Sequence, residues 1–131
     1  MKRLIALLVF MCAGSAIAAG NVSSGNDSAG SADAGKILFA SVCQSCHGQD
    51  GAGDGPGAAE FVLRPRPFSQ AAFKFDTDSD WEKGSDLDLA NVIKDGAAAY
   101  GGSALMPSWP ALTDQNVLDL VAYIRSVGPP R

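Results

Sequence analysis

The chain has 131 residues, enough for one domain, and its formal net charge is −4. Without Lys2 and Arg3, which lie in a segment with the features of an export signal, eight basic residues face fourteen acidic ones, a charge of −6. Such a surface disfavours nucleic acid and anionic membranes and favours a partner protein with a basic docking face. Charge alone does not identify that partner, because acidity also keeps an exported protein in solution.

Residues 1–18 have the pattern of a cleavable signal peptide. Lys2 and Arg3 give a positive start, residues 4–11 form an apolar run, and Ala-Ile-Ala at residues 16–18 is a small-x-small cleavage site. The apolar run is too short to span a bilayer as a helix, so we expect no transmembrane segment in the mature chain. We therefore predict export to the periplasm and cleavage at the end of this segment.

Cys12 lies inside the predicted signal. A lipoprotein anchored through Cys12 is the alternative to simple cleavage, but Met11 stands where that processing requires a small residue. Loss of Cys12 leaves Cys43 and Cys46 as the cysteines of the mature chain, and both belong to one motif. The exported domain must therefore be held together by something other than a disulfide framework.

The first helix is predicted at the start of the folded domain, which we place at residues 32–131. Residues 19–31 are small and polar and bury too little apolar surface to fold, so we interpret them as a flexible leader. Ser31 or Asp33 would cap the helix. One buried helical face is indicated by the spacing of Gly35, Leu38, Phe39, Val42 and Cys46.

That face leads into the sequence Cys-Gln-Ser-Cys-His at residues 43–47, which we interpret as a covalent haem attachment site. In a helix, Cys43, Cys46 and His47 are spaced at i, i+3 and i+4, so both thiols and the imidazole project from one face. This arrangement suits one haem c held by two thioether bonds, with His47 as an axial ligand of its iron.

The same motif could be half of a zinc site or a redox-active dithiol. Zinc would need further ligands, but the mature chain offers no third cysteine and no second histidine. A thioredoxin-like dithiol would open a helix after a strand, whereas a helical pattern precedes this motif. Haem attachment is therefore favoured. Because a haem offers a large apolar surface for packing, we predict that the chain without it is largely unfolded.

Two further helices are predicted beyond the glycine-rich loop at residues 48–57. The first would begin after Ser85 and stop at Gly96, and the second would begin after Thr113 and stop before Gly128. No stretch alternates with period two for long enough to predict a strand. We therefore expect an all-α fold of three to five helices, with long loops wrapped around the haem.

Met106 is the candidate for the second axial ligand. His47 is the only histidine of the chain, so ligation by two histidines of one molecule is excluded, and the two other methionines belong to the predicted signal. Pro107 and Pro110 stiffen the loop that carries Met106. Packing in the core is the alternative, but Met106 lies on no helical face. Methionine opposite histidine raises the reduction potential relative to two histidines.

The order of these segments resembles the class I, monohaem c-type cytochromes of bacteria over about residues 32–128. The resemblance is carried by CQSCH, by LRPRPF and LMPSWP, and by the final helix LTDQNVLDLVAYIRS. It implies that the first and last helices cross at Gly35, Phe39, Leu120 and Tyr123. It also implies that a proline carbonyl, from Pro65 or Pro67, accepts a hydrogen bond from the second nitrogen of His47.

The resemblance implies haem c as cofactor and electron transfer as activity. We expect a periplasmic, monomeric one-electron carrier that is not an enzyme, with iron cycling between Fe(II) and Fe(III) and with redox proteins as donor and acceptor. One alternative is a haem-c subunit of a larger dehydrogenase or oxidase. The other is an open-site haem enzyme or gas sensor, which requires that Met106 is not a ligand.

Overall fold

The computed structural model describes residues 29–129, so the predicted signal, Cys12 and most of the predicted leader lie outside the described residues. Within this range the chain is helical, without strands, which confirms the all-α prediction. Its α-helices are α1 (Ala32–Val42), α2 (Gln44–His47), α3 (Asp86–Asp95) and α4 (Asp114–Ser126). No helix in the described part of the chain is long and apolar enough to cross a membrane.

The three longer helices begin directly after the capping residues expected from the sequence. The hydroxyl of Ser31 accepts a hydrogen bond from the third residue of α1. Ser85 and Thr113 form reciprocal capping boxes with Asp88 and Asn116 at the starts of α3 and α4. These local bonds satisfy amide groups that a helix start leaves unpaired, so each start is determined by a few neighbouring residues.

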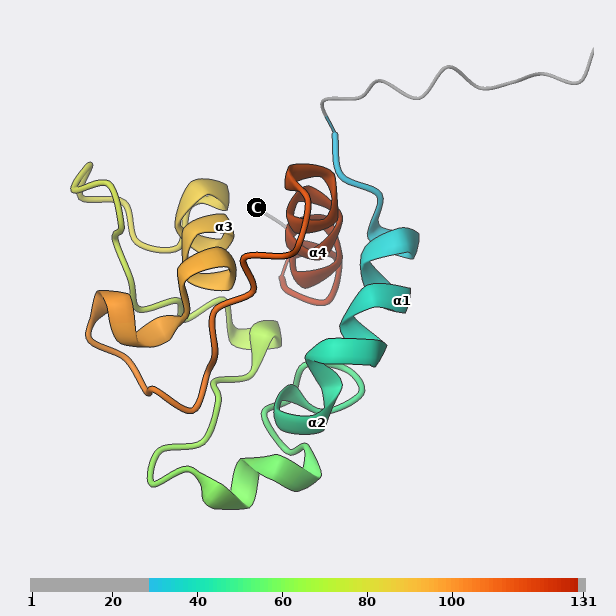
Figure 1. The fold of residues 1–131 in the computed structure, drawn as a ribbon, viewed down its shortest axis with the longest axis vertical. Coiled ribbons are helices and arrows are strands. Elements are labelled where there is room, and N and C mark those ends of the chain that lie inside the picture. The colour runs from blue at the N-terminus through green and yellow to red at the C-terminus, as the bar shows by residue number, and fades with distance from the viewer. Residues whose placement is uncertain (1–28, 130–131) are drawn as a thin grey trace, which may run out of the picture.

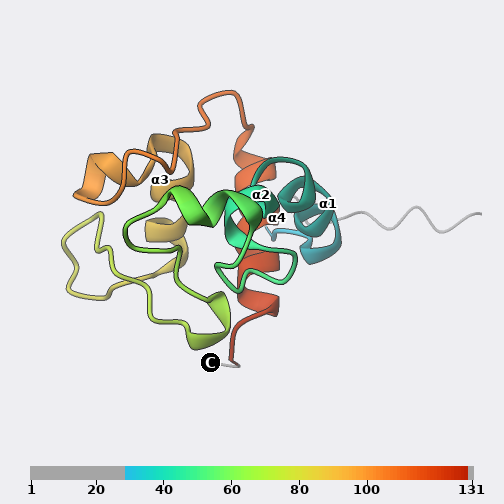
Figure 2. The ribbon, with the colours of Figure 1, turned by 90° about the horizontal axis from the view of Figure 1, so that it is seen from below.

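Helices α1 and α4 lie side by side, and α3 lies on the other side of α4 (Figures 1 and 2). At the crossing, a Cβ added to Gly35 would lie 1.9 Å from the carbonyl oxygen of Asp119, so the two backbones approach too closely for any side chain. The rings of Phe39 and Tyr123 are 5.0 Å apart, and Leu120 is also buried. The expected crossing of the first and last helices is therefore present.

The start of α1 is also tied to α4. The amide of Ser31 donates to Oδ1 of Asp119 at 2.7 Å, and Gln115 donates to the same oxygen at 2.9 Å. Asp119 is only 8% exposed, so this carboxylate needs such donors. The chain therefore enters the domain along α4.

The core lies where α1, α3 and α4 meet. Its buried members are Phe39, Ile93, Val117, Leu120, Val121, Tyr123 and Ile124. Helix α4 contributes Val117, Leu120, Val121, Tyr123 and Ile124, all of which are buried.

Three short 3₁₀ helices interrupt the loops, at Pro56–Glu60, Phe68–Gln70 and Ala97–Tyr100. Hydrophobic periodicity predicts none of them, because a single turn has no hydrophobic period to detect. In both ribbon views the loops at residues 61–85 and 101–113 lie on the α3 side of α4, whereas the glycine-rich loop lies beside α1 and α2 (Figures 1 and 2). The first two loops form one wall of the cavity described next.

Candidate haem-binding site

The Cys-x-x-Cys-His motif lies at a break between two helices. Cys43 ends α1 and precedes α2. Its carbonyl oxygen accepts hydrogen bonds from the amides of Cys46, at 3.2 Å, and His47, at 3.0 Å. These bonds keep the i, i+3 and i+4 relationship of the three side chains despite the break. Both cysteines and the histidine line the same cavity, as the motif predicts.

This cavity has a volume of about 790 Å³ and a mainly apolar wall. Its wall combines α1, α2, α3 and α4 with the loops, and includes Phe39, Val42, Val92, Leu120 and Ile124. The volume lies within the range of sites that enclose small molecules and cofactors. A wall drawn from all four α-helices means that whatever fills the cavity also holds the domain together.

Burial shifts the titration of His47 and Cys43, and the shift at His47 suits metal binding. Burial lowers the pKa of His47, so its imidazole is neutral near pH 7, which is the form that binds a metal. Burial, followed by the proximity of Cys46, raises the pKa of the Cys43 thiol to about 11. Neither of the two cysteines in the described residues forms a disulfide, so both sulfurs remain available.

The second nitrogen of His47 does not have the expected partner. Nδ1 is buried and is the one such side-chain nitrogen or oxygen in residues 29–129 without a hydrogen bond. Pro65 and Pro67 line the cavity, but neither carbonyl accepts from it, so the expectation of a proline acceptor is wrong for this structure. The imidazole instead stacks on Phe68, with ring centroids 5.0 Å apart and planes inclined by 26°.

The glycine-rich loop connects the motif to this segment. The amide of Gly53 donates to the carbonyl of His47 at 2.7 Å, and a Cβ on Gly53 would lie 2.0 Å from the carbonyl oxygen of Pro65. The carbonyl of Gly51 accepts from the amide of Phe68 at 2.9 Å. The sequence predicts only a loop for this stretch. Its glycines in fact allow the segment that carries Pro65 and Phe68 to approach the histidine.

Met106 lines the same cavity as the motif, although it is 59 residues further along the chain than His47. It is half-buried, its amide donates to Ser103 at 3.2 Å, and its carbonyl accepts from Ala97 at 3.3 Å. The structure therefore brings all four predicted site residues, Cys43, Cys46, His47 and Met106, to one cavity wall.

Asp88 also belongs to this wall, although no motif of the sequence assigns it to the site. It is 1% exposed, and its carboxylate accepts hydrogen bonds from the amides of Thr77 and Ser85. Burial alone would raise its pKa, but these hydrogen bonds outweigh burial and lower the pKa to about 2. Its position three residues after Ser85 is the sequence signal that could have identified its capping role.

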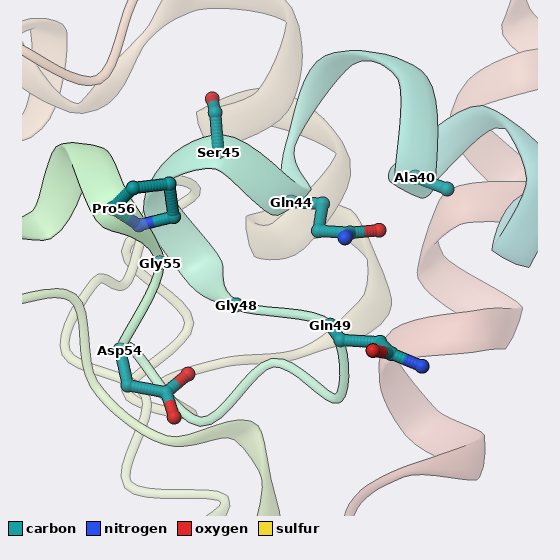
Figure 3. A pocket seen from close by; sticks show the side chains of 8 residues that line it. All are labelled: Ala40, Gln44, Ser45, Gly48, Gln49, Asp54, Gly55 and Pro56. Atoms are coloured by element: carbon teal, nitrogen blue, oxygen red, sulfur yellow. The ribbon is translucent and has the colours of Figure 1, made fainter.

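A smaller, open hollow of about 360 Å³ lies on the other face of α2, lined by residues that include Gln44, Ser45 and Asp54 (Figure 3). The side chains of Ser45, Gln44 and Asp54 point in different directions in this view. Because they do not converge on one point, the hollow offers no set of ligands comparable to that of the larger cavity.

The larger cavity fits a haem by its donor set and its wall. Two unpaired thiols, a neutral imidazole and a thioether border an apolar space. Cys43 and Cys46 are spaced for covalent attachment.

Two comparisons with known proteins concern the domain that contains this cavity. The family model described as Cytochrome c matches residues 32–128. Among solved structures, a chain of the Kuenenia stuttgartiensis reducing HAO-like protein complex is similar, with 28% sequence identity and a TM-score of 0.61. The match covers 73% of this chain and 42% of that chain, so this protein spans less than half of the length of that neighbour.

Proposed function

Because this chain belongs to the cytochrome c family, we propose that it is a periplasmic one-electron carrier with a single haem c ligated by His47 and Met106. The observation that carries the proposal is the shared cavity of Cys43, Cys46, His47 and Met106. A bound haem c supplies the one-electron change between Fe(II) and Fe(III).

Each of these residues has a distinct part in the proposal. Cys43 and Cys46 would hold the haem through thioether bonds, and the neutral imidazole of His47 would bind its iron. Met106 would provide the opposite ligand, which favours reduced iron relative to a second histidine. The stacking of Phe68 on the imidazole restricts rotation of the ring, which keeps its ligating nitrogen oriented.

We further propose that the protein makes and breaks no substrate bonds. Its single histidine and both cysteines of the mature chain are assigned to the haem, which leaves no histidine or thiol for acid–base or nucleophilic chemistry. Donor and acceptor would be redox proteins, and the acidic surface favours partners with a basic face.

The test is an absorption spectrum and a redox titration of the purified holoprotein and its Met106→Ala variant. We expect one reversible one-electron transition in the wild type and a methionine-to-iron(III) charge-transfer band that the variant lacks. Leu105→Ala is the matched control, since it shortens the adjacent, half-exposed side chain and leaves the thioether in place. Persistence of the band in Met106→Ala would show that the ligand assignment is wrong.

A second candidate function is that of a haem subunit in a larger redox complex. It is favoured by the similarity to a longer chain that belongs to a protein complex. Both functions use the same haem residues, so a spectrum does not separate them. Size-exclusion chromatography of the natively expressed protein does, because a free carrier elutes at the mass of one chain and a subunit co-elutes with its partners.

The open-site alternative predicts a different spectrum. If Met106 is not bound to iron, the haem is five-coordinate and the reduced protein binds CO rapidly at neutral pH. A six-coordinate, low-spin spectrum with slow CO binding supports the carrier instead.

A further inference from the structure

We infer that Asp88 lowers the reduction potential of the haem by placing a fixed negative charge in the wall of the cavity. The inference rests on the proposed function, because it requires a one-electron haem couple. It concerns a residue that neither attaches the haem nor binds its iron.

Asp88 is buried at the wall of the cavity. It belongs to the first turn of α3 and borders the cavity together with Leu89 and Val92 of the same helix. With an exposure of 1%, it is among the largest fully buried side chains in the described residues, beside Phe39 and Leu120. Water therefore does not solvate its carboxylate directly.

Two backbone amides hold the carboxylate of Asp88 in its charged form. The amide of Ser85 donates to Oδ2 at 2.9 Å, and the amide of Thr77 donates to Oδ1. Hydrogen bonds of this kind favour the ionised carboxylate, and with a pKa of about 2 the group stays charged at any physiological pH. Reduction of the haem would therefore leave Asp88 unprotonated, so an electron enters without a coupled proton at this residue.

No cation in the described part of the chain forms an ion pair with this carboxylate. Within residues 29–129 the ion pairs are Lys94 with Asp114 and Arg125 with Asp86. Asp88 is held by neutral backbone dipoles, which stabilise the negative charge without cancelling it. Asp88 therefore keeps its own negative charge at the cavity wall, which Arg64, Arg66 and Lys74 also line without forming an ion pair with it.

Coulomb attraction connects this charge to the potential. Ferric haem carries one more positive charge than ferrous haem. A nearby anion therefore stabilises the oxidised state more than the reduced state, which lowers the reduction potential. The effect is stronger in the protein interior than in water, because the effective dielectric constant is lower. Salt also screens a buried charge much less than a surface charge.

The test is the midpoint potential of the Asp88→Asn holoprotein, which removes the charge and keeps the size of the side chain. At a fixed ambient potential we expect the ratio of reduced to oxidised protein to rise by about tenfold, equivalent to about 59 mV for one electron. Asp88→Ser is a second neutral variant, for use if the asparagine variant does not accumulate with haem. An unchanged potential in the neutral variant that folds would overturn the inference.

Two controls separate charge from structure. Asp86→Asn removes the same charge from the same helix turn, but at a side chain that is 58% exposed, so a smaller shift that disappears at high salt is expected. Ser85→Ala removes the capping hydroxyl and keeps the charge of Asp88. It should lower stability without moving the potential. A shift in Ser85→Ala equal to that in Asp88→Asn would attribute the effect to helix disruption and contradict the inference.

The wild-type titration distinguishes this inference from the proposed function. If the wild type shows no reversible one-electron haem couple, the proposed function itself fails. If the couple is present and Asp88→Asn does not move it, only the role of Asp88 is wrong.

Discussion

The backbone amide of Ala97 donates a hydrogen bond to the carbonyl oxygen of Met106, with 3.3 Å between the two atoms. A second bond, from the amide of Trp109 to the carbonyl of Lys94 at 3.0 Å, joins the same loop to the same helix end. The proposed sulfur ligand is thus positioned by the C-terminal end of α3. Substitutions at that end of α3 should therefore alter the ligation of the iron, although Met106 itself is unchanged.

Gly96 is the residue at which this dependence can be tested. Its φ is +80°, and an added Cβ would lie 2.8 Å from the amide nitrogen of Ser108 and 3.1 Å from the carbonyl oxygen of Met106. We expect Gly96→Ala to displace the loop and weaken the methionine-to-iron(III) band. Gly101→Ala is the matched control, because Gly101 has a φ of +76° but no atom within 4 Å of an added Cβ.

Alanine at Gly101 carries the cost of a left-handed backbone, about 1–2 kcal/mol. Gly96 has a φ of +80° and a ψ of 155°, a conformation that is essentially restricted to glycine, so alanine costs more there. Urea unfolding should therefore show a loss of stability in both variants, with the larger loss in Gly96→Ala. Only Gly96→Ala should change the spectrum. Identical spectra for the two variants would show that the contact at Gly96 does not position Met106.

The double variant Cys43→Ala, Cys46→Ala should lack covalent haem and lose most of its tertiary structure. The reason is the cavity of about 790 Å³, whose apolar wall then has nothing to pack against. Near-UV circular dichroism measures the loss, and Ser45→Ala, an exposed residue between the two cysteines, is the control. A native-like near-UV spectrum in the haem-free double variant would contradict the prediction.

Asp88 should also make stability depend on pH in acid. Its pKa is about 2 in the folded chain, below its ordinary value of 3.8, so its stabilisation is present above about pH 4 and is lost as the pH falls toward 2. Asp88→Asn should lower the free energy of unfolding at pH 7 by about 1.5–3 kcal/mol, the contribution of hydrogen bonds to a charged group.

The difference in the free energy of unfolding between wild type and Asp88→Asn should then become smaller as the pH falls from 4 to 2. Urea unfolding at several pH values measures it. Asp114→Asn is the control, since the carboxylate of Asp114 pairs with Lys94 at the surface, where such pairs contribute little. A difference that does not change with pH would mean that the hydrogen bonds of Asp88 do not depend on its charge.

Gly35→Ala tests the crossing of α1 and α4. In most helices this change stabilises by up to about 1 kcal/mol, because alanine has the higher helix propensity. Here the added Cβ would lie 1.9 Å from the carbonyl oxygen of Asp119, so we expect a loss of about 1–3 kcal/mol instead. Thermal or urea unfolding shows whether the variant is less or more stable than the wild type. A more stable variant would show that the two helices can move apart to accept the added Cβ.

The parts of the fold that were predictable depend on neighbouring residues or on a specific motif. Ser31, Ser85 and Thr113 start helices through bonds that span three residues, and a sequence contains that information directly. The placement of Met106 on the cavity wall was anticipated because the chain offers few alternative ligands.

The remaining features depend on contacts between distant segments. The expected acceptor for His47 was wrong, because Phe68 stacks on the ring and the carbonyl of Pro65 packs against Gly53 instead. The burial of Asp88 arises from the loop around Thr77, whose path no periodicity specifies. A sequence gives the charge of a residue but not the dielectric environment in which that charge lies.

The bond between Ser31 and Asp119 has a practical consequence for work with this protein. This bond holds the start of the domain against α4. Asp119 does not line the haem cavity, but the next residue of the helix, Leu120, does. Successive residues of a helix point about 100° apart, so the entry point and the cavity use different faces of α4. A tag or surface linker joined upstream of residue 29 therefore leaves the cavity face open to electrodes and partner proteins.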